Sequence, residues 1–228
     1  MNRNSKILVG LSVLVISIFL FIAYGTDVCR YYRNASTANA PTLPVGSRML
    51  VSSLIKPNRL DFVTFKVGDS LFGKGKIIQR LVGIPGDTLE IKNGKLFINE
   101  HLVDSSLNLA HKYRVPFKMA EVIKQDLLNM YDGMPYYFQN KDSVTLFIPK
   151  NIANINDLGN YRIIENKKKF DELIFSIFNK KWNKDHFGPL ILKEKEYFVM
   201  GDNRDNSHDS RYLGPILQGQ IIGKAIRF

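Results

Sequence analysis

The stretch GDNRDNSHDSR, residues 201–211, decides how this chain is interpreted. It holds three Asp, two Arg, two Asn, two Ser, one His and one Gly, and no apolar side chain. Strand-like sequence flanks it, EYFVM at 196–200 and YLGPI at 212–216. Carboxylates and amides can accept backbone hydrogen bonds, and each arginine offers several N–H donors. We therefore expect a tight loop whose polar groups satisfy one another and hold both strands in place, as the surroundings of an active site require.

Two other interpretations of this loop are equally good on composition alone, an exposed acidic turn and a cation site of Asp and Asn ligands. The chain has 228 residues, 45% of them hydrophobic and 23% charged, which suits one domain with a sizeable core, or a domain with a lid. The net charge is +11, but the basic residues are scattered, so we expect anionic lipid and not nucleic acid as a partner. The single cysteine, Cys29, excludes an intramolecular disulfide and a cysteine zinc cluster.

An uncharged apolar run, residues 7–25, follows a short tail at 1–6 that carries two positive charges. At a rise of about 1.5 Å per residue it is just long enough to cross the hydrocarbon core of a bilayer. The Ala-Tyr-Gly sequence at 23–25 could be the cleavage site of a removed signal peptide. The run is longer than a typical signal-peptide core, however, so we predict a retained single-span transmembrane anchor.

After residue 40 the sequence is typical of β-strands. Short segments rich in Val, Ile and Phe are bounded by Pro, Asn and Gly. We predict strands at 47–54, 61–67, 76–84, 196–200 and 221–228. The segment 88–98 predicts two further strands joined by Asn93-Gly94, the preferred pair for a type I′ hairpin turn.

The middle of the chain has a different pattern. Residues 170–178 place apolar side chains at helical spacing, and residues 121–131 do so more loosely. We predict that 104–190 is an α/β insertion or cap subdomain, carried on a β-rich body formed by 26–103 and 191–228. The predicted fold class is mainly β, with antiparallel sheets and one N-terminal transmembrane helix.

Five features of the chain resemble bacterial signal peptidase I, in the order that the family has them. The loop at 201–211, preceded by FVM and followed by YLG, resembles the family's most recognisable block. APTLPVGSRMLV at 40–51 resembles the segment after the nucleophile, and RLDFVTFK at 59–66 resembles a following strand. QRLVGIPGDTLEI at 79–91 resembles the strand and Pro-Gly-Asp turn that carry the catalytic lysine. The N-terminal anchor is the fifth feature.

The resemblance implies a mostly antiparallel β body on the outer face of the cytoplasmic membrane. It implies a serine endopeptidase, a hydrolase that removes signal peptides from exported preproteins by cutting after a small-x-small sequence. The family uses a Ser nucleophile and a Lys general base, with no cofactor and no metal. A lysine can take a proton from serine only when burial lowers the pKa of its amine. The substrate would lie extended, as an added strand.

Both catalytic positions of the family are substituted in this chain. The family pattern Pro-Ser-Gly-Ser-Met-x-Pro-Thr-Leu falls on residues 35–43, which puts Ala38 at the nucleophile position. The lysine of the run Lys-Arg-x-Val-Gly-x-Pro-Gly-Asp falls on Gln79. Alanine has no nucleophilic atom, and a glutamine amide is not a base near neutral pH. The loop nevertheless matches the family at the supporting residues Asp202, Asn203, Arg204, Ser207, Asp209 and Arg211.

Neighbouring residues could replace the missing pair. Ser36 falls where the family has an oxyanion-hole contributor, and a local bulge could bring it, or Thr37, into the attacking position. As a replacement base, Lys76 is expected on the opposite face of the strand from Gln79. His208 is expected to be a solvated loop residue.

Three hypotheses for the function follow. The first is an active membrane-bound signal peptidase that uses Ser36 or Thr37 with another base. The second is a catalytically silent homologue that binds extended peptides or a partner at the membrane. The third is a structural β domain at the membrane whose cap mediates assembly.

Overall fold

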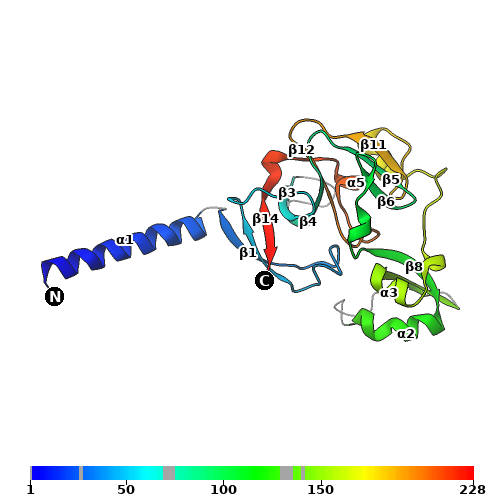
Figure 1. Ribbon diagram of the computed structural model, residues 1–228, viewed down its shortest axis with the longest axis horizontal. Helices are drawn as coiled ribbons and strands as arrows, with labels where there is room; N and C mark the ends of the chain where they lie inside the picture. Colours follow the sequence, from blue (N-terminus) through cyan, green and yellow to red (C-terminus); the bar gives the residue numbers. More distant parts are fainter. Residues whose placement is uncertain (1, 26–27, 69–74, 129–135, 140–141) are drawn as a thin grey trace.

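The computed structural model describes residues 2–25, 28–68, 75–128, 136–139 and 142–228. A long helix, α1 (Arg3–Gly25), projects from a β-rich body (Figure 1). Its described apolar side chains, up to Phe21, are largely exposed, and Phe19 for example is 69% exposed. The segment Arg3–Phe21 has a mean hydropathy of 2.0, and among the described residues it is the one helix long and apolar enough to cross a membrane. The predicted N-terminal apolar helix is therefore present.

The body is built on a seven-stranded antiparallel sheet with the strand order β1-β2-β14-β3-β4-β12-β13. Phe65, Leu81 and Val199, from three neighbouring strands, are fully buried in one core cluster. The sheet confirms the strands predicted from branched and aromatic residues and adds one strand at each edge. Its strands are β1 (Cys29–Arg33), β2 (Arg48–Ser52), β14 (Ile221–Arg227), β3 (Phe62–Val67), β4 (Gly75–Gly83), β12 (Glu196–Met200) and β13 (Ile216–Leu217).

A second, four-stranded sheet has the order β11-β5-β6-β7. Asn93 and Gly94, between β5 and β6, have φ angles of 50° and 67°. A type I′ turn requires positive φ at both central residues, so the predicted hairpin is confirmed. The strands are β11 (Phe187–Ile191), β5 (Thr88–Lys92), β6 (Lys95–Ile98) and β7 (His101–Leu102).

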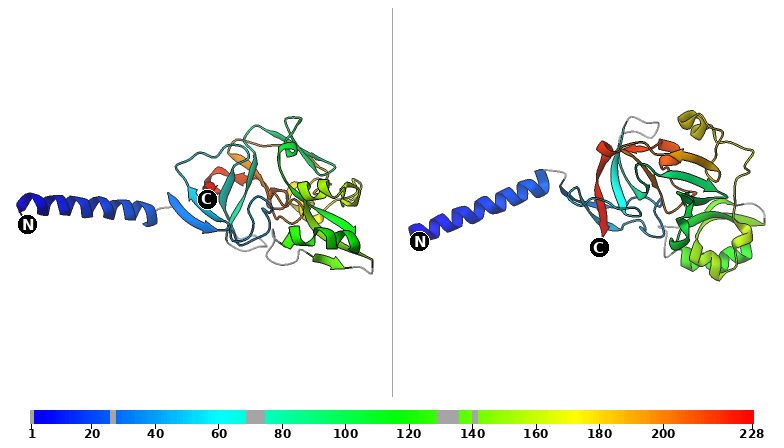
Figure 2. Two further views of the ribbon diagram at one scale, coloured as in Figure 1. Left: turned by 60° about the horizontal axis from the view of Figure 1, so that its bottom comes forward. Right: turned by 45° about the horizontal axis from the view of Figure 1, so that its top comes forward.

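The first part of the predicted insertion forms a lobe beside the body (Figure 2). A three-stranded sheet of order β8-β10-β9 packs against two helices, with Val115, Ile123 and Leu146 in its core. The helix predicted at 121–131 begins earlier, and residues 129–131 lie outside the described ranges. The elements of the lobe are β8 (Ala110–Pro116), α2 (Phe117–Leu128), β9 (Tyr136–Gln139), β10 (Ser143–Pro149) and α3 (Lys150–Ile155).

The second part of the insertion packs onto the body. The helix predicted from apolar spacing is α4 (Glu172–Phe178), which begins where Asp171 accepts two backbone N–H bonds and ends at the left-handed Asn179. Its Ile174 is buried with Phe187 of β11 in the core of the four-stranded sheet. Short 3₁₀ helices lie at Asp104–Ser106, Gly159–Tyr161 and Gln218–Gln220.

Candidate active site

The polar loop at 201–211 follows β12 and ends in a single helical turn, α5 (Ser210–Leu213). Arg211 is only 2% exposed. Its Nε donates to Oδ1 of Asp209 at 2.8 Å, and its Nη2 donates to Oδ2 of the same carboxylate at 2.9 Å. Burial opposes the charge of Arg211, but the Asp209 carboxylate outweighs it, so the pKa of the guanidinium is raised. The loop is thus held internally by a forked, fully buried ion pair.

Other loop residues bond outside the loop, which the sequence did not predict. Asp202 accepts from Nε and Nη2 of Arg80 on β4, at 2.7 and 2.5 Å. The Thr42 hydroxyl donates to the same carboxylate. Arg204 donates to the carboxylate of Asp104 at 2.7 Å. The loop therefore ties together three distant segments, in addition to satisfying its own polar groups.

The backbone around Ala38, which the sequence predicts at the family's nucleophile position, is held by this loop. The backbone N–H of Asn203 donates to the carbonyl oxygen of Ala38 at 3.0 Å. The Asn203 amide donates to the Thr37 carbonyl at 3.2 Å, and the Asn206 amide donates to the Thr37 hydroxyl at 2.9 Å. The segment containing Ala38 is therefore fixed against the loop by main-chain and side-chain hydrogen bonds.

Gly201 allows this close approach. A β-carbon at this position would lie 2.2 Å from Oγ of Ser207 and 2.4 Å from the carbonyl oxygen of Ala38. We expect Gly201→Ala to destabilise the protein by about 1–3 kcal/mol, because the clashing backbone cannot yield as a side chain can. Urea unfolding measures the effect. Gly219→Ala, which would meet no atom within 4 Å, is the matched control. Equal unfolding midpoints for the two variants would contradict the expectation.

Gln79 of β4 is buried, 1% exposed, and is paired with Val63 on the neighbouring strand β3. Its Nε2 donates to Oγ of Ser207 at 3.0 Å and to the carbonyl oxygen of His208 at 2.8 Å. A carbonyl accepts and never donates, so this contact assigns the amide orientation. The Gln79 side chain is therefore a neutral donor whose two amide hydrogens are both in use.

The residues considered as replacements for the catalytic pair have other hydrogen-bond or stacking partners. Oγ of Ser36 accepts from the backbone N–H of Ala38 at 3.3 Å, and no described amine is bonded to it. Lys76 donates to the Tyr32 hydroxyl at 3.1 Å. His208 stacks on Tyr212, and burial lowers the pKa of its imidazole against the pull of Asp209. The described contacts thus bring no base to Ser36.

A cavity of about 410 Å³ brings the predicted positions together. Ser36, Ala38 and Gln79 all line it, as do Lys76 and His208. The six supporting residues do not line it and instead lie in the loop behind it. Sequence reasoning missed Thr42 and Asp104, although Thr42 lies in a block that the sequence singled out.

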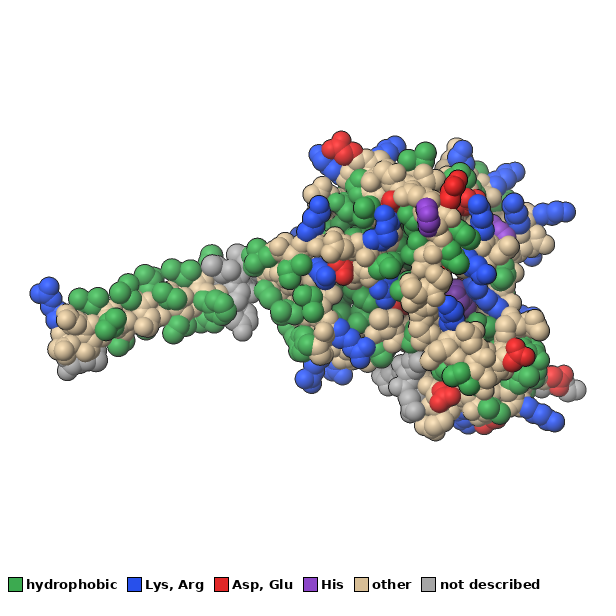
Figure 3. Space-filling view, in the orientation of Figure 1, with side chains coloured by type: hydrophobic (Ala, Val, Ile, Leu, Met, Phe, Trp, Pro, Cys, Tyr) green, Lys and Arg blue, Asp and Glu red, His purple; other side chains and the backbone are tan. Residues whose placement is uncertain are grey.

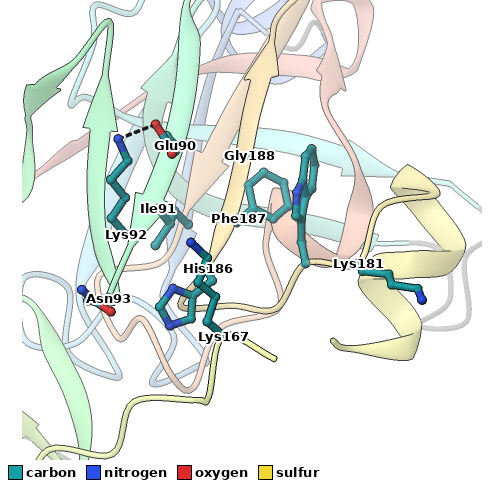
Figure 4. Close-up of a pocket in the computed structure, with 10 residues that line it drawn as sticks. Glu90, Ile91, Lys92, Asn93, Lys167, Lys181, His186, Phe187 and Gly188 are labelled. Carbon is teal, nitrogen blue, oxygen red and sulfur yellow. Dashed lines mark ion pairs between the residues drawn. The ribbon is translucent and has the colours of Figure 1, made fainter. Parts of the chain in front are cut away.

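A second cavity, of about 400 Å³, lies beside β5 and β11 (Figure 4). Trp182 and Phe187 form one wall, with ring centroids 4.7 Å apart. Lys92 and Glu90, also at this cavity, form an ion pair of 2.7 Å. None of the predicted site residues lines it, so the first cavity is the candidate active site.

The residues of this site all lie within the part of the chain that matches known proteins. The sequence profile described as "Signal peptidase, peptidase S26" matches residues 6–228. Signal peptidase I of Buchnera aphidicola subsp. Baizongia pistaciae is 28% identical over 225 residues, covering 88% of this chain and 69% of its own. Signal peptidase I S of Bacillus subtilis (strain 168) is 27% identical over 227 residues, covering 97% and 88%. The solved signal peptidase I of Enterococcus faecalis V583 is 21% identical, with a TM-score of 0.35, covering 75% of this chain and 97% of its own.

Proposed function

This chain belongs to the signal peptidase family, peptidase S26, and on that premise we propose that it binds extended segments of exported preproteins at the membrane without cutting them. Signal peptidases of this family are serine hydrolases that remove signal peptides. The proposal keeps the family's ligand and its peptide cavity, and gives up its reaction.

This proposal rests on the residues at the two predicted catalytic positions, Ala38 and Gln79. Ala38 and Gln79 both line the cavity. Neither side chain can attack a carbonyl or take up a proton near neutral pH. Removing the nucleophile of a serine protease lowers turnover by a factor on the order of 10⁶. Among the described residues that line the cavity Ser36 is the one serine, and its described hydrogen bond comes from a backbone N–H and not from a base.

Membrane attachment is the second part of the proposal. The apolar helix α1 supports a retained anchor, with the body on the outer face of the membrane. Apolar side chains also cover the part of the body next to α1 (Figure 3). In the register of β1, β2 and β14, Tyr31 lies opposite Leu50, and Leu50 lies opposite Ile226. These three residues are 58%, 39% and 38% exposed, which supports contact between this face and lipid.

The proposed function goes with the domain arrangement predicted from the sequence, a body that carries an inserted cap. Residues 26–103 and 191–228 form the peptide-binding body, and 104–190 form a cap inserted in it. Support comes from the lobe built on β8, β9 and β10, whose core cluster consists of residues between 113 and 158 together with Ala40 of the body.

A cleavage and binding assay tests the proposal. The purified chain, in non-ionic detergent, is incubated with an exported preprotein that has an Ala-x-Ala site, in parallel with a Ser36→Ala variant. We expect no cleavage by either protein, together with saturable binding of a labelled peptide that contains the same site. Cleavage that disappears only in Ser36→Ala would contradict the proposal and identify Ser36 as the nucleophile. If the chain neither cleaves the preprotein nor binds the peptide, the result would favour the structural β domain.

A further inference from the structure

The candidate cavity has an uneven charge distribution. Two cationic side chains, Arg33 and Lys76, line it, and no Asp or Glu is among its described lining residues. His208 adds no charge near neutral pH, because burial lowers the pKa of its imidazole. The remaining lining groups are apolar or neutral. The described wall of the cavity therefore carries a net charge of +2.

These cations are available to a ligand. Arg33 and Lys76 are exposed, and within the described residues neither forms an ion pair with a carboxylate. Lys76 donates to the neutral Tyr32 hydroxyl at 3.1 Å and lies 5.6 Å from the centre of the Tyr32 ring. These contacts position its ammonium group without neutralising it. Lys66 of β3 lies directly opposite Lys76, which adds a further positive charge nearby.

We propose that this cavity selects extended peptides that carry a carboxylate next to their small side chains. The inference rests on the proposed function, and it names the class of peptide that a non-cutting cavity would retain. An opposite charge on the ligand offsets the positive charges of Arg33 and Lys76, and both side chains can also donate hydrogen bonds to it. A cavity of about 410 Å³ falls within the range of sites that enclose small ligands.

The carboxylate could come from an acidic side chain or from the free C-terminus of a peptide already released by proteolysis. Both sources present the same group to the lysine and arginine. A free terminus would make the ligand the product of an endopeptidase that cuts after small residues. The experiment separates these two sources.

Three labelled peptides with one Ala-x-Ala core test the proposal. The first has Glu beside the core and an amidated end, the second has no Glu and a free carboxylate directly after the core, and the third is neutral throughout. Binding to the full chain in non-ionic detergent is followed by fluorescence anisotropy at low and high salt. We expect at least one charged peptide to bind about five-fold tighter than the neutral one at low salt, the effect of one or two partly exposed ion pairs. High salt should reduce the difference.

Two variants locate the contact. Lys76→Gln should remove most of the gain for the charged peptide, whereas Lys66→Gln should leave most of it, because Lys66 does not line the cavity. Equal affinity for all three peptides would overturn this inference and leave the proposed function standing. Equal losses in the two variants would also overturn it, because they would indicate a diffuse field and not a contact in the cavity. Failure of every peptide to bind would overturn the proposed function as well.

Discussion

We expect the double variant Ala38→Ser/Gln79→Lys to cleave an exported preprotein at an Ala-x-Ala site that the unmodified chain leaves intact. The surrounding scaffold is already in place, because the Ala38 backbone is bonded to Asn203 and the cavity joins positions 38 and 79. The expected gain is at least about 10³-fold in rate, a fraction of the roughly 10⁶-fold loss that follows removal of a nucleophile. Gel electrophoresis of the preprotein measures it.

The environment of Gln79 suits a lysine amine. Nε2 of the glutamine already donates to Ser207 and to the carbonyl of His208. An ammonium group at this place can donate to the same two acceptors. The position is 1% exposed, and burial lowers the pKa of an amine toward the range that a general base needs. Since only the neutral amine can take the serine proton, the rate should rise with pH through that lowered pKa.

The single variants are the controls. Ala38→Ser alone supplies a hydroxyl without a base, and Gln79→Lys alone supplies a base without a nucleophile. Each should be slower than the double variant by at least about 10²-fold, the smaller end of what general-base catalysis contributes. A double variant that melts at the same temperature as the unmodified chain but does not cleave would show that the cavity no longer aligns the two groups.

Arg211→Ala should unfold the body at a much lower temperature. The guanidinium is 2% exposed and forks onto Asp209, so its removal leaves a buried carboxylate without its cation. Breaking a buried ion pair in this way costs about 3–5 kcal/mol. For a chain of this length each kcal/mol lowers the melting temperature by about 2–4 °C, so we expect a decrease of at least about 6 °C. Differential scanning calorimetry of the full chain in detergent measures it.

Arg114→Ala is the matched control, because Arg114 is an exposed arginine on β8. Its loss should change the free energy of unfolding by no more than about 0.5 kcal/mol. A melting temperature for Arg211→Ala within one or two degrees of that control would contradict the structural role assigned to the loop. That outcome would mean that the ion pair between Arg211 and Asp209 does not stabilise the body.

The strands that are rich in branched and aromatic residues and bounded by turn residues in the β-rich body were predictable, and two strands of the insertion were not. β3 and β4 follow from their Val, Ile and Phe content and their flanking Gly and Asn. β10 was missed although six of its seven residues are buried, because a short continuous apolar run does not by itself distinguish a buried strand from a buried helix. β8 was missed because His111, Lys112 and Arg114 interrupt its apolar residues.

The candidate site was predictable where a motif placed it and not where contacts cross the chain. Ser36, Ala38 and Gln79 line one cavity, as the family pattern implied. The sequence could not reveal that Asp202 bonds to Arg80 and Thr42, since these partners lie 122 and 160 residues away. Nor could it reveal that Gly201 is required by the proximity of Ser207, because that clash exists only once the loop has closed. The roles of these residues stay predictions until the variants are made.

The position of β14 determines where a fusion partner or a label should be attached to this protein. β14 pairs with β2, which in turn pairs with β1 just after α1, and the ring of Phe228 lies 6.3 Å from that of Tyr31. With α1 in a bilayer, a fusion partner or surface tether attached after Phe228 would emerge beside the lipid. It would crowd the apolar strand face there. A label on the exposed Lys95, in the hairpin far from α1, would leave that face clear.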